Sequence, residues 1–349
     1  MNDAIITVFW LIVVCIISFI LLSLHLLWKK SQEEHRRTTI DHYKNKTESA
    51  WYDYFINDGE LIESFIPKQR EEIIGYEELA NVYVTSLTAT HTAEKLHYIA
   101  TQYLHDYYKK LLNSSRRSNR LNALARIEDY GNIEVLKECK WVQKEEKEKE
   151  ECILLLSIYS KYDESTFKQL LFQYQSILTE FDCRILFNRL SFSVLTSFFA
   201  HFNEFESHLK YALIDTVSNK HTFEAIPYLL ELVHDDDKEI RIRVAKAIYD
   251  LGIEEEAFCV ELSESATWEE RLMAAKLARY VKFSKSKPIL FRLLEDMEWR
   301  VRVQAAQTIA RHNEGRASLE TYIMTATDNY AIEAAQEVLR KEGDWSWIG

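Results

Sequence analysis

The sequence predicts an all-α protein with a single transmembrane helix at the N-terminus, followed by an α-solenoid of helical hairpins. Three observations lead to this prediction. The 349 residues include only 7 Gly and 3 Pro, the residues that most disfavour a helix interior. Residues 5–28 form an apolar run with no charged residue and only four polar ones, Thr7, Ser18, Ser23 and His25. From about residue 205 onward, landmarks recur at intervals of roughly 30 residues, the length of two short helices with their turns.

The apolar run from Ile5 to Trp28 contains no Asp, Glu, Lys or Arg. As a helix it would be roughly 36 Å long, enough to cross a bilayer core of about 30 Å. Trp10 and Trp28 lie towards its two ends, where indole rings suit the membrane interface. A cleaved signal peptide is the alternative, but nothing basic precedes the run and no small-x-small cleavage pattern follows it. We therefore expect residues 1–28 to be a retained transmembrane anchor.

The charges on either side of this anchor predict its orientation. The amino side carries only Asp3, whereas the carboxyl side carries a group of basic residues, namely Lys29, Lys30, Arg36 and Arg37. Positive residues next to a span stay on the cytoplasmic side. The five cysteines lack a CxxC spacing, which fits a reducing compartment. We expect a single-pass plasma-membrane protein with its N-terminus outside and its C-terminal body in the cytoplasm.

Behind the anchor the sequence divides into three regions. Residues 29–50 are polar and mixed in charge, as in a juxtamembrane stalk. Residues 51–204 are aromatic-rich and helical, with degenerate repeats. Within them, residues 94–112 have the apolar spacing of one long amphipathic helix. Residues 205–349 carry the clear repeats and a C-terminal cap.

Two stretches of the last region repeat four landmarks at the same intervals. A Pro, an Asp in a turn and a β-branched residue followed by Arg occur at Pro227, Asp235, Ile240 and Arg241, and again at Pro288, Asp296, Val301 and Arg302. The intervening copy keeps Arg271 but lacks the Pro and the Asp. Each hairpin of this length leaves one apolar face uncovered, so only stacking on its neighbours completes a core.

With these landmarks the chain resembles HEAT repeats of the short bacterial kind, over about residues 205–342. In that family the turn Asp and the helix Arg pair to brace successive hairpins. The resemblance implies this role for Asp235, Arg241, Arg271, Asp296 and Arg302. Anchor, aromatic region and repeats together resemble bacterial membrane-anchored HEAT-repeat proteins. Several of those proteins occur together with membrane glycosyltransferases. The resemblance therefore implies that this chain functions in an envelope polysaccharide system.

The second helices of such a stack line its concave face. On these helices, a row of mostly polar residues is predicted to point away from the core, and we expect this row to bind a protein partner. The candidate face consists of Arg243, Lys246, Lys276, Tyr280, Gln304, Gln307, Arg311 and Gln336. An ordinary solvated face explains the row equally well. At the C-terminus, Trp345 and Trp347 either cap the last hairpin or dock a partner.

No motif in the sequence predicts catalysis, a cofactor or a metal site. There is no GxxxxGK[ST], GxGxxG or GxSxG motif, and none of the eleven histidines is followed by Glu, as in HEAT-like di-iron hydroxylases. The acidic run Asp235 to Asp237 is expected to be solvated rather than to hold a cation. A net charge of −12 argues against a nucleic-acid partner.

The sequence therefore predicts a membrane-tethered scaffold or adaptor without enzymatic activity. Its cytosolic solenoid would bind a protein partner, and a membrane glycosyltransferase is one candidate. The alternative is an enzyme or enzyme subunit that acts on a membrane-associated substrate. A third option is a sensor of membrane charge that uses the basic residues of the stalk. No residue pattern identifies the partner, the pathway, the oligomeric state or a regulating signal.

Overall fold

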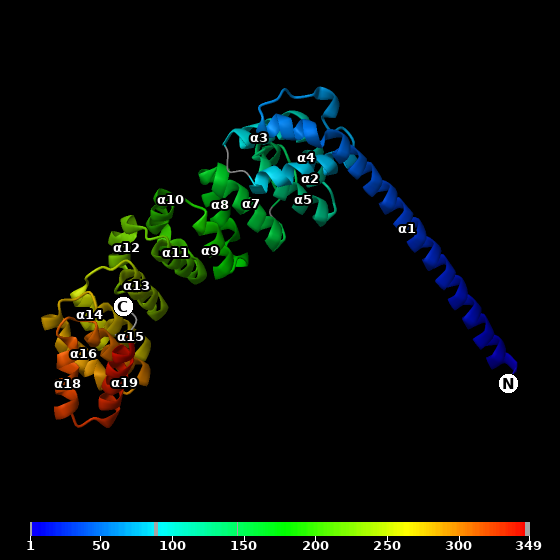
Figure 1. Cartoon of the computed structure of the whole chain (residues 1–349). Helices are drawn as coiled ribbons and strands as arrows, with labels where there is room; N and C mark the ends of the chain where they lie inside the picture. Colours follow the sequence, from blue (N-terminus) through cyan, green and yellow to red (C-terminus); the bar gives the residue numbers. More distant parts are fainter. Residues whose placement is uncertain (1, 87–89, 145, 346–349) are drawn as a thin grey trace. The chain divides into compact units, whose positions relative to one another are not determined.

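The computed structural model describes the backbone of residues 2–86, 90–144 and 146–345. Over these residues the chain is all-α, with 19 α-helices, four short 3₁₀ helices and no strand (Figure 1). The prediction of an all-helical protein is therefore confirmed. The chain forms two compact units, Met1–Lys147 and Glu148–Gly349, and the expected boundary after residue 204 lies inside the second unit.

The first unit begins with one long helix, α1 (Asn2–Ile56), drawn in blue in Figure 1. Its apolar part is exposed, and the rings of Trp10 and Trp28 are 61% and 59% exposed. The most apolar window of the segment Phe9–Ile56 has a mean hydropathy of 2.7 and no buried residue. Among the described residues this is the one helix long and apolar enough to cross a membrane. A signal sequence near the N-terminus passes the same test.

The C-terminal part of α1 packs against α2 (Arg70–Ser86). Its buried side chains recur at intervals of three or four residues, which places them on one face of the helix: Ile40, Tyr43, Thr47, Trp51 and Phe55. Residues 29–50, the expected stalk, are thus helical throughout, and the end of this segment belongs to the packed body. Gly75 allows the two helices to approach closely, because a Cβ at this position would lie only 2.9 Å from Cδ1 of Tyr43.

The remaining helices of the first unit are η1 (Glu63–Phe65), α3 (Thr90–Tyr103), α4 (His105–Leu112), α5 (Arg117–Tyr130) and α6 (Glu134–Lys137). The prediction of one helix over residues 94–112 is wrong, because the chain breaks at Leu104 between α3 and α4. No Pro or Gly marks this break. Leu104 is fully buried, and both α3 and α4 contact α5. Tertiary packing therefore overrides a local sequence that would continue the helix.

The second unit consists of short helices joined by tight turns. Its first half contains α7 (Lys149–Tyr162), α8 (Glu164–Tyr174), η2 (Gln175–Ile177), α9 (Glu180–Asn188), α10 (Phe192–Ser197), η3 (Phe198–Glu204), α11 (Ser207–Asn219) and η4 (Phe223–Ala225). Its second half contains α12 (Ile226–Glu231), α13 (Lys238–Asp250), α14 (Glu256–Ser263), α15 (Trp268–Leu277), α16 (Phe283–Leu294), α17 (Trp299–Ala310), α18 (Gly315–Thr325) and α19 (Asn329–Trp345).

Alternate helices of this unit contact one another in order: α9 with α11, α11 with α13, α13 with α15, α15 with α17 and α17 with α19. Ala245 of α13, Ala275 of α15 and Ala306 of α17 are fully buried within this unit. Because an alanine extends little beyond the backbone, the helices can pack closely at these points. The side chains of Trp345 and Trp347, for which a capping role was considered, lie outside the described residues.

Candidate functional site

Arg271 of α15 connects its own turn to the next hairpin. Its Nη1 donates hydrogen bonds to the backbone oxygens of Ser265 and Ala266, at 2.9 and 3.1 Å. Its Nε and Nη2 donate to the two carboxylate oxygens of Asp296, at 2.5 and 2.9 Å. Asp296 also caps the following turn by accepting a hydrogen bond from the N–H of Glu298 at 2.9 Å. The ion pair between Arg271 and Asp296 thus joins the turn before α15 to the turn before α17, and it holds these two successive hairpins together.

Arg241 of α13 is arranged similarly, but its carboxylate partner differs from the expected one. Its Nη1 donates to the backbone oxygens of Asp235 and Asp236, at 2.7 and 3.1 Å. Its Nε donates to the carboxylate of Glu270 in the next hairpin, at 2.7 Å. The carboxylate of Asp235 instead accepts a hydrogen bond from the N–H of Asp237 at 2.8 Å. The turn Asp and the Arg are therefore linked through the backbone rather than through a side-chain pair.

Arg302 of α17 binds its turn in the same way, through the backbone oxygens of Asp296 and Met297 at 2.8 and 3.0 Å. Towards the last hairpin it meets an aromatic ring rather than a carboxylate. Its guanidinium lies 5.3 Å from the ring centroid of Tyr330 in α19. We call Arg241, Arg271 and Arg302 the bracing arginines.

The two carboxylates that accept hydrogen bonds from Arg241 and Arg271 are held in the charged form. Burial would raise the pKa of Glu270, but hydrogen bonds from Arg241, Ser265 and Thr267 lower it below its ordinary value. Burial would likewise raise the pKa of Asp296, but hydrogen bonds from Arg271 and the backbone, with the charges of Arg271 and Arg302, lower it. These groups are engaged within the fold, which fits a structural role.

The eight residues of the predicted partner-binding face lie in different environments. Three are exposed: Lys246, Arg311 and Gln336. Four are half-buried: Lys276, Tyr280, Gln304 and Gln307. The ring of Tyr280 packs against that of Tyr249 at a centroid distance of 5.6 Å, and Gln304 donates a hydrogen bond to Thr308 at 3.2 Å. The row is therefore a partly accessible polar surface.

Arg243 differs from the other seven. Its side chain is 19% exposed and pairs with three carboxylates, Glu180 at 2.8 Å, Asp215 at 2.6 Å and Glu239 at 2.6 Å. Its guanidinium also lies 4.7 Å from the ring centroid of Tyr211. Because the three carboxylates belong to α9, α11 and α13, this guanidinium ties three helices together. Arg243 thus lies inside an ion network and not at the outward position expected of a partner-binding residue.

A second surface, which the sequence reasoning missed, lies at the N-terminal ends of α15, α17 and α19. Trp268, Trp299 and Tyr330 occupy equivalent places in three successive hairpins, 31 residues apart. Trp299 is 57% exposed, Tyr330 68%, and Met297 in the preceding turn 96%. We call this surface the aromatic edge, made of Trp268, Met297, Trp299, Arg300 and Tyr330. The recurrence of aromatic residues at one interval was the signal that could have revealed it.

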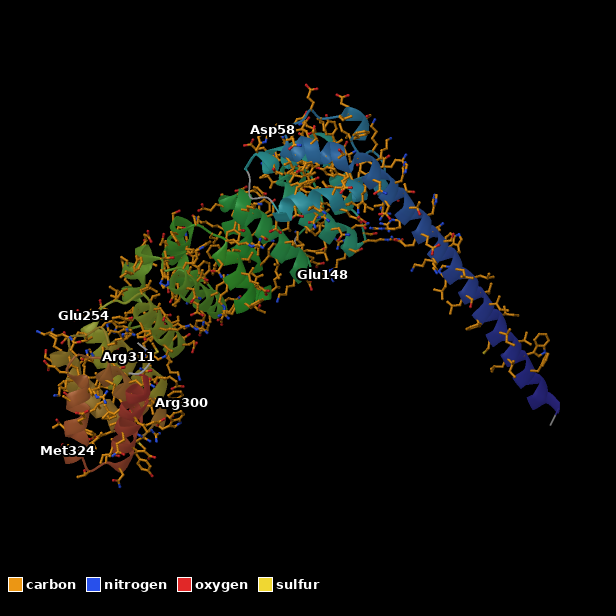
Figure 2. The ribbon with its side chains drawn as sticks, in the orientation of Figure 1. Asp58, Glu148, Glu254, Arg300, Arg311 and Met324 are labelled. Atoms are coloured by element: carbon orange, nitrogen blue, oxygen red, sulfur yellow. The ribbon has the colours of Figure 1, made fainter. Side chains whose placement is uncertain are left out.

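Arg300 connects two rings of the aromatic edge. Its guanidinium lies 5.0 Å from the ring centroid of Trp268 and 5.7 Å from that of Trp299. Figure 2 shows Arg300 at the surface of the second unit, near the opposite end of α17 from Arg311. Trp, Tyr and Arg dominate the energetics of protein interfaces, and clustered exposed apolar side chains mark such surfaces. The chemistry of this edge therefore suits binding.

The cysteines and acidic groups of the described part of the chain do not form a reactive or metal-binding cluster. No group of three or more His, Cys, Asp or Glu there is arranged to hold a metal ion. Burial raises the pKa of Cys183 and of Cys259 to about 12, so both thiols stay protonated and are poor nucleophiles. No protein-family model matches the chain, and no curated protein matches it either.

Proposed function

We propose that this chain is a membrane-tethered adaptor whose helical hairpins bind a protein partner. The aromatic edge is the observation that carries the proposal, because it places aromatic side chains at one position of three successive hairpins, where Trp299 and Tyr330 are exposed and Trp268 is half-buried. We further propose that the hairpins of the second unit form a HEAT-like solenoid. The ordered contacts between alternate helices and the bracing arginines support this architecture.

In this proposal α1 anchors the chain in the plasma membrane. An apolar helix this exposed is unfavourable in water, whereas a bilayer core would cover it. The basic residues that follow Trp28 favour an outside N-terminus and a cytoplasmic body. Confinement to the membrane raises the local concentration of the adaptor near other membrane proteins, so a modest affinity suffices.

The partner that fits the aromatic edge presents an apolar side chain next to a carboxylate. Met297 and Trp299 offer exposed apolar contact area. Arg300 pairs only loosely within the chain, at 4.0 Å from Glu298, and can therefore turn its donors to a carboxylate of the partner. The resemblance to bacterial membrane-anchored HEAT-repeat proteins makes a membrane glycosyltransferase of an envelope polysaccharide system one candidate.

The test is cross-linking of the full chain in native membranes, followed by purification and mass spectrometry. The variants are Trp299→Ala and Arg300→Ala on the aromatic edge, with Met324→Ala as a matched control. Met324 is 85% exposed, lies near the C-terminal end of α18 and is not one of the residues of the aromatic edge. A Lys246→Glu/Lys276→Glu variant examines the polar row on the second helices. Thermal melting of each variant checks that the fold is intact.

We expect a stoichiometric protein partner that is lost with Trp299→Ala and retained with Met324→Ala. Truncation of a hot-spot aromatic residue costs about 2 kcal/mol or more, roughly a thirtyfold loss of affinity. If the cross-linked partners of Trp299→Ala and Met324→Ala are the same, the aromatic edge is not the binding surface. A co-purified small molecule in place of a protein would favour the alternative, an enzyme or enzyme subunit acting on a membrane-associated substrate.

A further inference from the structure

Three adjoining cavities of the first unit are lined by α2 together with residues of α1, α4 and α5, and α1 contributes to two of the three. Arg70 lines all three, while Arg36 and Tyr107 each line two. The largest has a volume of about 940 Å³ and is bounded by the start of α2 and by α4. We call the three together the juxtamembrane groove, because its outer end is formed by Trp28 and Lys29, where the apolar part of α1 ends.

The groove is richer in basic than in acidic side chains, although the whole chain has a net charge of −12. Its basic residues are Lys29, Arg36, Lys68, Arg70, Lys110 and Arg126. Its acidic residues are Glu33, Glu71, Glu77 and Asp106.

Two of the acidic residues are already neutralised inside the unit. Glu77 accepts a hydrogen bond from Tyr108 at 2.9 Å and pairs with Arg126 at 3.6 Å. Glu33 pairs with Arg36 at 3.1 Å.

The basic groups that remain are placed to receive an anion. Among the described residues no ion pair joins a carboxylate to Lys68, Arg70 or Lys110, and Arg70 interacts with the hydroxyl of Tyr107. The Nε of Arg36 is also buried, and it has no hydrogen-bond acceptor among the residues that the structure describes. A buried donor without an acceptor is costly, so a ligand oxygen or a water is needed there.

The lining of the largest cavity combines charge with hydroxyl and apolar groups. Lys68, Arg70 and Lys110 provide the positive charge, and Tyr103, Ser115 and Asn119 provide further hydrogen-bonding groups. Ile66, Ile73 and Leu111 supply an apolar part of the wall. A ligand with a phosphate, a polar substituent and an attached apolar chain matches this combination.

The position of the groove along α1 indicates where such a ligand comes from. Arg36 follows Trp28 by eight residues of unbroken helix, roughly 12 Å at about 1.5 Å per residue. The polar headgroup layer lies directly outside the apolar core of a bilayer, about 5 to 8 Å deep on each side. With Trp28 at the interface, the outer end of the groove at Trp28 and Lys29 lies in this layer, and Arg36 lies a few ångströms beyond it.

We propose that the juxtamembrane groove binds the phosphate headgroup of an anionic phospholipid from the membrane that holds α1. The inference rests on the proposed membrane anchoring but not on the protein partner. Binding would fix the orientation of the first unit relative to the bilayer surface, because α1 and α2 both contribute to the groove.

The experiment titrates the delipidated full chain in detergent with phosphatidylglycerol and counts bound lipids by native mass spectrometry. The variant is Arg70→Gln/Lys110→Gln, and the matched control is Arg292→Gln, an exposed arginine of the second unit. Phosphatidylcholine and inorganic phosphate serve as the other ligands. A parallel reconstitution into lipid nanodiscs checks membrane insertion separately.

We expect phosphatidylglycerol to bind the wild type and Arg292→Gln equally, and the double variant about thirtyfold more weakly. This estimate follows from about 1 kcal/mol for each basic residue near an anionic surface. Equal binding to the double variant and the wild type overturns the proposal, as does equal preference for phosphatidylcholine. Full displacement of the lipid by inorganic phosphate would identify a soluble phosphate ligand instead. Failure of the protein partner to bind leaves these outcomes unchanged, and failure to insert into nanodiscs appears as a separate result.

Discussion

Arg271 shows how one side chain can hold two hairpins together. A guanidinium has five N–H donors in a fixed plane, so it can bond turn oxygens on one side and a carboxylate on the other. Asp296, which receives it, has a side chain only 7% exposed. A carboxylate in that position is stable only because Arg271 and the N–H of Glu298 replace the water it has lost.

Asp296→Asn tests this ion pair with almost no change in shape. The amide can still accept the hydrogen bond from the N–H of Glu298, but it no longer balances the charge of Arg271. We expect the free energy of unfolding of the second unit to fall by about 2 to 4 kcal/mol at neutral pH. Urea denaturation followed by circular dichroism measures this loss. The control is Glu264→Gln, which removes an exposed pair with Arg292 and should cost less than about 1 kcal/mol.

The pH dependence of the same variant gives a second readout. The pKa of Asp296 is lower in the folded chain than its ordinary value of 3.8, so its stabilising contribution is fully present above that value. The contribution is lost as the pH falls through the lowered pKa of the folded state. The difference in unfolding free energy between wild type and Asp296→Asn should therefore shrink below pH 3.8. A difference that stays constant as the pH falls below 3.8 and through the lowered pKa of the folded state would show that the charge of Asp296 does not stabilise the fold.

At the scale of elements, the contact between α1 and α2 links the candidate membrane span to the packed body. The contact depends on Gly75, which lies against Tyr43 and the backbone oxygen of Ile40. The ring of Tyr43 has little freedom to move, because its hydroxyl donates to the backbone oxygen of Phe65 at 2.6 Å and accepts from Trp51 at 3.2 Å. The two helices are thus held at a distance that only a glycine permits.

Gly75→Ala is predicted to destabilise the first unit. An alanine in an otherwise unhindered helix interior would stabilise it by about 0.5 to 1 kcal/mol. Here the added methyl group overlaps a fixed ring, and overpacking of this kind costs about 1 to 3 kcal/mol. The sign of the change in unfolding free energy, measured by urea denaturation, decides between these effects. Val82→Ala, at a position of α2 that is 56% exposed, serves as the control and should change stability little.

At the scale of the whole molecule, the proposed topology follows from one helix and the charges around it. If α1 is retained as an anchor, the intact mass of the purified protein includes residues 1–28, and deleting residues 2–28 moves the chain to the soluble fraction. Protease should then digest the body in sealed inside-out vesicles and leave it intact in right-side-out vesicles. A mature chain that lacks the apolar segment would instead identify a signal sequence, and protection in inside-out vesicles would reverse the topology.

The sequence by itself determined the features that depend on local chemistry. The scarcity of Gly and Pro predicts helices, because each residue's helix propensity acts through its own backbone. The interval between Arg241, Arg271 and Arg302 predicted which arginines would lie in equivalent places, since a repeat reproduces its own turns. The apolar run of residues 5–28 likewise predicted the exposed apolar part of α1, because the hydropathy of a segment depends only on its own residues.

Only the tertiary structure decided the features that depend on residues far apart in the chain. Leu104 ends α3 because of what it packs against, and Glu270 rather than Asp235 supplies the carboxylate that binds Arg241. Arg243 has the spacing of an outward residue, yet carboxylates from three helices draw it into an ion network. Burial and charge pairing are set by neighbours 25 or more residues away in most of these contacts. Helical periodicity assigns a face to each side chain but does not say which neighbour that face will meet.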